Sequence, residues 1–221
     1  MTTNKQQRRR GKQNAETAAR TREAIIAAAT ECFSQVGYDA TSVREIAGTA
    51  RLTHGTLRHH FGSKLDIWKA VADAALEYYR EQLAPILLEA DQAYSVGRPD
   101  SLGDFKQVVQ VFIKASYSNP IFAKLLMGES QTDNERATYM RANFLSLHQP
   151  IGKLFERAQA DCQALKNYTN DSFFLALLSL TFFPITQPGI HTLLGESATA
   201  HPEDQVHRIM GILFNDVHRG P

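Results

Sequence analysis

The segment from His54 to Phe61 carries side chains suited to binding a nucleic acid. If it is helical, the positions that face away from Leu57 and Phe61 hold no acid and little apolar bulk. An arginine can donate two hydrogen bonds to O6 and N7 of guanine, and a threonine can bond a base edge or touch the methyl group of thymine. A solvent-exposed helix with a small residue for packing is the alternative. The outward residues are His54, Gly55, Thr56, Arg58, His59 and His60.

The three histidines also raise the question of a metal site. His54 and His59 lie five positions apart and His60 is adjacent to His59, so none of them has the i, i+4 spacing of a zinc-binding helix. The chain contains no Gly-x-Ser-x-Gly, no His-Glu-x-x-His, no phosphate loop and no Gly-x-Gly-x-x-Gly. We therefore expect no metal, no cofactor and no enzymatic activity.

Two short helices with a tight turn between them are predicted to position these residues. Ser42 followed by Glu45 is the signature of a capping box, which starts the first helix. Thr53 is suited to cap the second helix, with Leu57 and Phe61 facing inward. In such a pair one helix can cross the phosphate backbone while the second enters the major groove.

The rest of the chain also has helical periodicity, so the fold class is all-α. An apolar stripe that includes Ile25 and Phe33 ends at Gly37, and a long helix restarts at Ser63. We expect Pro150 and Pro184 to kink or break the helices that contain them. The further helices are expected near 101–118, 120–129, 134–161, 170–187 and 202–218.

Three stretches between Thr41 and Lys64 resemble the DNA-binding domain of the tetracycline-repressor (TetR) family, and the similarity extends over residues 20–76. They are Thr41-Ser42-Val43-Arg44-Glu45-Ile46-Ala47, Leu52-Thr53-His54-Gly55-Thr56-Leu57 and His59-His60-Phe61-Gly62-Ser63-Lys64. The resemblance implies an N-terminal three-helix helix-turn-helix DNA-binding domain and a C-terminal helical domain for ligand binding and dimerisation. It also implies a homodimeric transcription factor, usually a repressor, that a small molecule releases from a palindromic operator.

The resemblance implies roles for single residues as well. Thr53 and Thr56 match positions that hold phosphates or bases, and Lys64 matches a lysine that pairs with a phosphate. Arg58 stands where the family usually has Tyr, and Arg51 stands where Gly is frequent; a left-handed backbone at Arg51 costs about 1 kcal/mol or more. The predicted DNA-binding residues are Thr41, Ser42, Arg44, Thr53, His54, Gly55, Thr56, Arg58, His59 and Lys64.

Composition and charge set the limits of this hypothesis. The chain has 221 residues and a formal charge of +1, but residues 1–64 hold 11 Lys or Arg against 5 Asp or Glu. We expect a disordered basic arm over 1–14, a DNA-binding domain over 15–64 and an effector-binding and dimerisation domain over 65–221. The basic N-terminus has no apolar stretch behind it, so we expect no secretory signal.

Membrane insertion and disulfide formation are not expected. The longest nearly apolar run, Phe173–Ile185, is shorter than the roughly 20 residues of a membrane span. Cys32 and Cys162 indicate reduced, buried thiols in a cytoplasmic protein, with a single disulfide as the alternative.

The C-terminal half is rich in Phe, most of which must be core. The candidate residues of an effector pocket are Tyr117, Phe122, Phe144, His148, Phe174 and Gln187, and the alternative for each is an ordinary core or surface residue. They favour a largely apolar, aromatic or acyl effector. The segment 173–194 is apolar around most of its circumference, so it forms either a dimer interface or a central core helix. The interface candidates are Phe173, Leu177, Leu180, Ile209 and Leu213.

These observations predict a ligand-responsive regulator that binds double-stranded DNA as a homodimer. The long helix from residue 63 would begin in one domain and end in the other, so it can couple ligand and DNA binding. The alternative is a helical ligand-binding or protein-interaction module that no longer binds DNA sequence-specifically.

Overall fold

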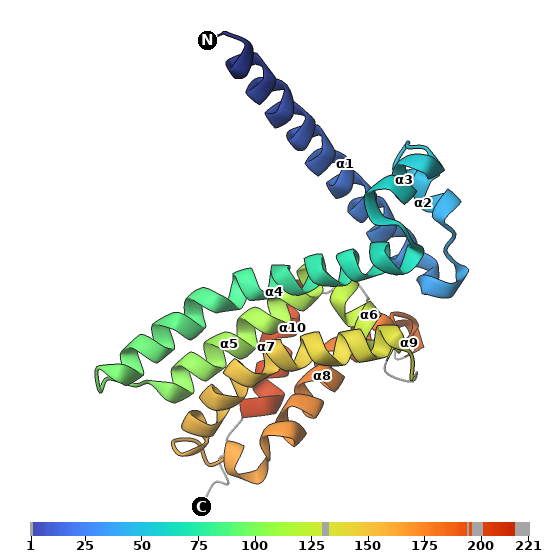
Figure 1. Ribbon diagram of the computed structural model, residues 1–221. Coiled ribbons are helices and arrows are strands. Elements are labelled where there is room, and N and C mark those ends of the chain that lie inside the picture. The colour runs from blue at the N-terminus through green and yellow to red at the C-terminus, as the bar shows by residue number, and fades with distance from the viewer. Residues whose placement is uncertain (1, 130–132, 194, 196–200, 215–221) are drawn as a thin grey trace, which may run out of the picture. The chain divides into compact units, whose positions relative to one another are not determined.

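The computed structural model describes residues 2–129, 133–193, 195 and 201–214. All regular structure in these residues is helical, which confirms the all-α fold class (Figure 1). The chain divides into two compact units, Met1–Asp73 and Ala74–Pro221. The boundary therefore falls inside helix α4 (Lys64–Ser95), whereas the sequence placed it at residue 64. The start of α4 belongs to the first unit because Ile67 and Trp68 are buried there, with Trp68 edge-on to Tyr38.

The first unit consists of α1 (Thr2–Ala40), α2 (Val43–Thr49), α3 (His54–Phe61) and the first turns of α4. Its core includes Ile25 and Phe33 of the predicted stripe, whereas Val36, at the end of that stripe, is exposed. Helix α1 bends at Gly37, whose φ of 79° is left-handed, where the stripe was predicted to end. The helix begins at Thr2, so the structure does not show the disordered arm expected over 1–14. Gln, Arg and Lys favour helix, and extending an existing helix needs no new nucleus.

The second unit contains the remaining helices, close to the predicted ranges; residues 215–218 of the last prediction lie outside the described residues. Helix α5 packs against α7 and α10, and α8 packs mainly against α6. A short 3-10 helix and helix α9 were not predicted. The elements are α5 (Ser101–Ser118), α6 (Ile121–Glu129), α7 (Glu135–Gln159), η1 (Leu165–Asn167), α8 (Asn170–Thr186), α9 (Gly189–Leu193) and α10 (Pro202–Phe214).

Proline does not break these helices, so of the two outcomes expected, a kink or a break, the break is excluded. Helix α7 continues through Pro150 and α8 continues through Pro184. A proline in a helix removes the hydrogen bond to the carbonyl four residues earlier. For Pro150 that carbonyl belongs to Ser146, and both residues are exposed, so water can take the place of the missing donor.

Aromatic side chains fill the core of the second unit. Phe105, Phe155 and Phe173 lie with ring centroids 5.2–5.5 Å apart. The hydroxyl of Tyr79 donates to Oγ of Ser116 at 3.0 Å. Both cysteines are free thiols, as predicted, although Cys32 is only half-buried. None of the helices in the described ranges is long and apolar enough to cross a membrane.

Candidate nucleic-acid interface and small-molecule groove

The start of α2 is fixed by the predicted capping box. Ser42 Oγ accepts a hydrogen bond from the Glu45 N–H at 3.2 Å, and Glu45 Oε2 accepts one from the Ser42 N–H at 2.6 Å. Hydrogen bonds to its carboxylate, first from the backbone and then from the side chain of Ser42, hold the pKa of Glu45 below its usual range. Ser42 and Arg44 are exposed at this helix N-terminus, the positive end of the helix dipole, which favours an anion such as a phosphate.

The end of α2 is a Schellman motif with an unusual residue in it. Arg51 N–H donates to the Gly48 carbonyl at 3.1 Å, and Leu52 N–H donates to the Ala47 carbonyl at 2.9 Å. Arg51 occupies the left-handed position of this motif with φ of 55°, where Gly is usual. The strain anticipated from the sequence is therefore present. The same motif ends α4 with Gly97 at the corresponding position, φ 71°.

Helix α3 turns one side inward and the other outward. Thr53 caps it by accepting from the Thr56 N–H at 3.1 Å. Leu57 is 0% exposed and Phe61 is 8% exposed, as predicted. Thr56 is half-buried, and its hydroxyl lies 2.9 Å from that of Thr53. The predicted residues that α3 leaves exposed are His54, Gly55, Arg58 and His59.

Lys64 and Thr41 have structural partners that the sequence did not reveal. Lys64 Nζ donates to the Thr41 carbonyl at 2.7 Å and lies 4.1 Å from the centroid of the Tyr38 ring. An ammonium has three donors, so this bond still leaves donors for a phosphate. Thr41 is 2% exposed and its hydroxyl donates to the Gly37 carbonyl at 2.7 Å. Its side chain is therefore part of the core, which corrects its prediction as a DNA-binding residue.

Arg22 on α1 supports α3 through contacts that the sequence did not reveal. Its guanidinium lies 4.1 Å from the centroid of the Phe61 ring and donates to the His60 carbonyl at 3.4 Å. Arg22 thus holds the C-terminal end of α3, where a cation is favoured. No local signal links the two, because they are 38 residues apart.

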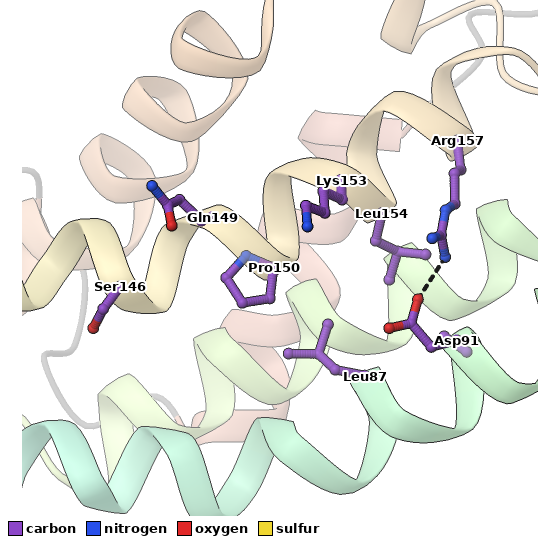
Figure 2. Close-up of a pocket in the computed structure, with 9 residues that line it drawn as sticks. Leu87, Asp91, Ser146, Gln149, Pro150, Lys153, Leu154 and Arg157 are labelled. Carbon is purple, nitrogen blue, oxygen red and sulfur yellow. Dashed lines mark hydrogen bonds and ion pairs between the residues drawn. The ribbon is translucent and has the colours of Figure 1, made fainter.

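The second unit has a groove between α4 and α7, which the sequence did not predict. Its volume is about 390 Å³, within the range of small-molecule sites. Figure 2 shows Leu87 of α4 facing Pro150 and Leu154 of α7. The ion pair between Arg157 and Asp91, 2.8 Å, joins the two helices. An adjoining, more apolar hollow of about 260 Å³ continues the groove past Arg80, Leu83 and Leu147.

None of the six predicted effector residues lines this groove. Phe144, His148 and Phe174 do lie together, with the His148 ring 5.8 Å and 4.1 Å from the two phenyl rings. Burial lowers the pKa of His148, and Asp171 offsets part of this effect.

The other three predicted effector residues lie apart from that stack. Phe122 is fully buried, 5.0 Å from the Tyr79 ring, and Gln187 is exposed at the end of α8. The hydroxyl of Tyr117 is buried and has no hydrogen-bond partner among the residues that the structure describes, and burial raises the pKa of Tyr117.

The predicted dimer-interface residues need a correction. Phe173, Leu177, Ile209 and Leu213 are 0–3% exposed in the monomer, so they form its core, and only Leu180 is half-exposed. Helix α8 is apolar on all sides, and the sequence could not tell which side the monomer buries. The apolar side chains that these helices expose are Leu175 and Phe183 of α8 and Ile212 of α10.

No group of three His, Cys, Asp or Glu side chains that could hold a metal ion occurs in the part of the chain that the structure describes. The capped turn, the acid-free outer side of α3 and the helical second unit define a helix-turn-helix transcriptional regulator.

Comparison with known proteins agrees with this class. The model for bacterial regulatory proteins of the tetR family matches residues 25–71. The HTH-type transcriptional repressor BepR of Brucella suis biovar 1 (strain 1330) is 30% identical over 149 residues, which cover 63% of this chain and 68% of BepR. Other curated relatives match over 27–34% of their own length. The chain belongs to the TetR family of transcriptional regulators.

Solved structures share the fold at low sequence identity. AibR, solved in complex with isovaleryl coenzyme A and operator DNA, matches with a TM-score of 0.69 at 15% identity, over 88% of this chain and 98% of AibR. A mutant of HlyIIR matches with a TM-score of 0.67 at 20% identity, over 90% of this chain and 100% of that one.

Proposed function

We propose that this regulator is a repressor that binds a palindromic operator as a homodimer and is released by a small, largely apolar effector. The observation that carries the proposal is that the outer side of α3 is exposed and contains no acid. The buried Leu57 and the capping residue Thr53 fix the orientation of this helix. The net positive charge of residues 1–64 supplies salt-sensitive attraction to any duplex, while His54 to His59 read bases. In a dimer, two such helices meet successive major grooves about 34–36 Å apart or a multiple of that.

Roles within the interface are tested by duplex selection and by two substitutions. The full chain is incubated with random duplexes, and the enriched sequence is measured by fluorescence anisotropy at several salt concentrations. We expect Lys64→Ala to weaken binding to all sequences about equally and to lower the salt slope by about one. Arg58→Ala should relax the preference at one base position, a loss of about 1–3 kcal/mol in discrimination.

Lys166→Ala, an exposed lysine of the second unit, is the control and should change neither property. The reverse pattern for Lys64 and Arg58 would overturn the assigned roles. If no sequence is enriched and the chain binds every duplex in a salt-sensitive way, the result would instead support a helical module without sequence-specific DNA binding.

Exposed apolar side chains on α8 and α10 support the homodimer. Leu175 is 67% exposed and Ile212 is 63% exposed, on two helices that contact each other. Burying such a patch against its own twofold copy removes it from water. We expect Ile212→Glu to convert the dimer to a monomer in size-exclusion chromatography with light scattering. Leu88→Glu, an equally exposed leucine on α4, should leave the mass unchanged; a monomeric wild-type protein would refute the proposal.

The groove between α4 and α7 is the proposed effector site. Helix α4 directly follows α3 in the chain and continues into the second unit, so one helix joins the DNA-binding unit to the groove. A ligand shifts an equilibrium only between states that it binds unequally. We propose that the effector binds preferentially to a conformation of the dimer in which the distance between the two α3 helices no longer matches the distance between successive major grooves of the operator. That AibR, of the same fold, was solved with both isovaleryl coenzyme A and operator DNA supports a small-molecule site in this fold.

A further inference from the structure

The groove between α4 and α7 combines an apolar floor with an excess of positive charge at its edges. The floor comes from Leu87 and Leu154 and continues into the adjoining hollow through Leu83 and Leu147. The charged lining residues of the two hollows are three cations, Arg80, Lys153 and Arg157, and one acid, Asp91. A neutral apolar ligand would match the floor alone, whereas an anion with an apolar tail would match both the floor and a cation.

The cations differ in what they already bind. Arg157 pairs with Asp91 at 2.8 Å, and Arg80 pairs with Glu77 at 3.3 Å. Lys153 is exposed at the groove, and it has no partner within the described ranges. Its ammonium is the group that an incoming anion can bind without first displacing a carboxylate of the protein.

Proline at position 150 adds a second polar feature to the groove. Pro150 has no N–H to donate to the carbonyl of Ser146, and both residues line the groove and the adjoining hollow. Arg80 reaches across from α4 and donates to Ser146 Oγ at 3.2 Å. The polar lining groups thus come from both helices, Arg80 and Asp91 from α4 and Ser146, Lys153 and Arg157 from α7, and the leucines of the two helices form the apolar part of the lining.

We propose that this groove binds an amphipathic organic anion, a carboxylate with an aliphatic or aryl tail. The carboxylate pairs with Lys153, and the tail lies on Leu87 and Leu154 toward Leu83 and Leu147. This inference rests on the proposed effector site and adds to it the charge of the ligand and the residue that recognises this charge.

Calorimetric titration of the full chain tests which charge the ligand carries. The three probes have tails of equal length and differ in charge: octanoate, octanol and octylamine. We expect octanoate to bind most tightly and octylamine not to bind. Lys153→Gln should lower the affinity for octanoate about fivefold, as for a partly exposed ion pair, and leave that for octanol unchanged. Lys166→Gln, an exposed lysine on η1, is the matched control and should change neither.

A second substitution separates failure of the charge from failure of the site. Leu87→Trp fills the groove and should abolish binding of octanoate and octanol alike. If octanol binds as well as octanoate, or if Lys153→Gln has no effect on octanoate, the anion proposal is wrong while the groove remains the effector site. If octanoate binding survives Leu87→Trp, or if no probe binds, both the anion proposal and the groove are refuted.

Discussion

Arg51 offers a direct measurement of strain in the turn between α2 and α3. It holds the left-handed position of the Schellman motif with φ of 55°, and its side chain is exposed. A left-handed backbone costs a residue with a Cβ about 1–2 kcal/mol, a cost that Gly does not carry. Gly also loses about 0.5–1 kcal/mol more backbone entropy on folding than Ala. We therefore expect Arg51→Gly to raise the free energy of unfolding of the first unit by about 0.5–1 kcal/mol.

Trp68 makes this change observable in the first unit. It is the only tryptophan of the chain, it is fully buried, and its ring lies 6.4 Å from that of Tyr38. Its fluorescence during urea unfolding therefore follows this unit. For a slope of about 1–3 kcal/mol per molar urea, the expected shift of the midpoint is roughly 0.2–1 M upward.

Arg51→Ala is the control that isolates the backbone. It removes the same positive charge as Arg51→Gly but keeps the Cβ and hence the strain, so its midpoint should stay close to that of the wild type. If the two variants unfold at the same urea concentration, the strain argument is refuted. A gain shared by both would mean that the Arg side chain, and not the backbone, is unfavourable.

Two further predictions concern the second unit, both measured by circular dichroism during urea unfolding. Arg136→Met should lower the free energy of unfolding by about 3 kcal/mol, because it leaves the buried Glu129 carboxylate without the guanidinium that lies 2.7 Å away. The control is Arg141→Met at an exposed ion pair, which should lower the free energy of unfolding by less than about 1 kcal/mol. Equal losses in the two variants would contradict the argument. Burial holds the pKa of His148 below its ordinary value of 6.5, and this effect outweighs the opposite effect of Asp171. The unfolded state therefore binds the proton more readily than the folded state. The contribution of His148 to the free energy of unfolding is fully present above pH 6.5 and is lost as the pH falls below 6.5. His148→Phe should flatten this decline between about pH 8 and pH 5, and an unchanged slope would show that other groups cause it.

Much of the DNA-binding unit was predictable because its signals are local. The capping box joins Ser42 to Glu45, three residues on, and the helical spacing of Leu57 and Phe61 fixes the inner side of α3. The Arg51 strain was also anticipated from the type of residue in the turn. Thr41 was predicted wrongly because its hydroxyl has an alternative acceptor in the Gly37 carbonyl, at a bend whose geometry the sequence does not give.

The second unit was predictable in its helices but not in their packing. Helix α8 is apolar on every side, so periodicity could not distinguish Leu177, which is buried, from Leu175, which is exposed. The groove went unpredicted because its two bridging contacts, Arg157 to Asp91 and Arg80 to Ser146, each join residues 66 positions apart.

The sequence by itself determined the helices, their caps and the acid-free outer side of α3, because capping and helical periodicity act between residues three or four positions apart. The tertiary structure decided which side of α8 is core, that Lys64 is bonded to Thr41, and that α4 and α7 form a groove whose Lys153 pairs with none of the described residues. These features depend on which surfaces meet across distant parts of the chain, and only close packing of whole helices selects them.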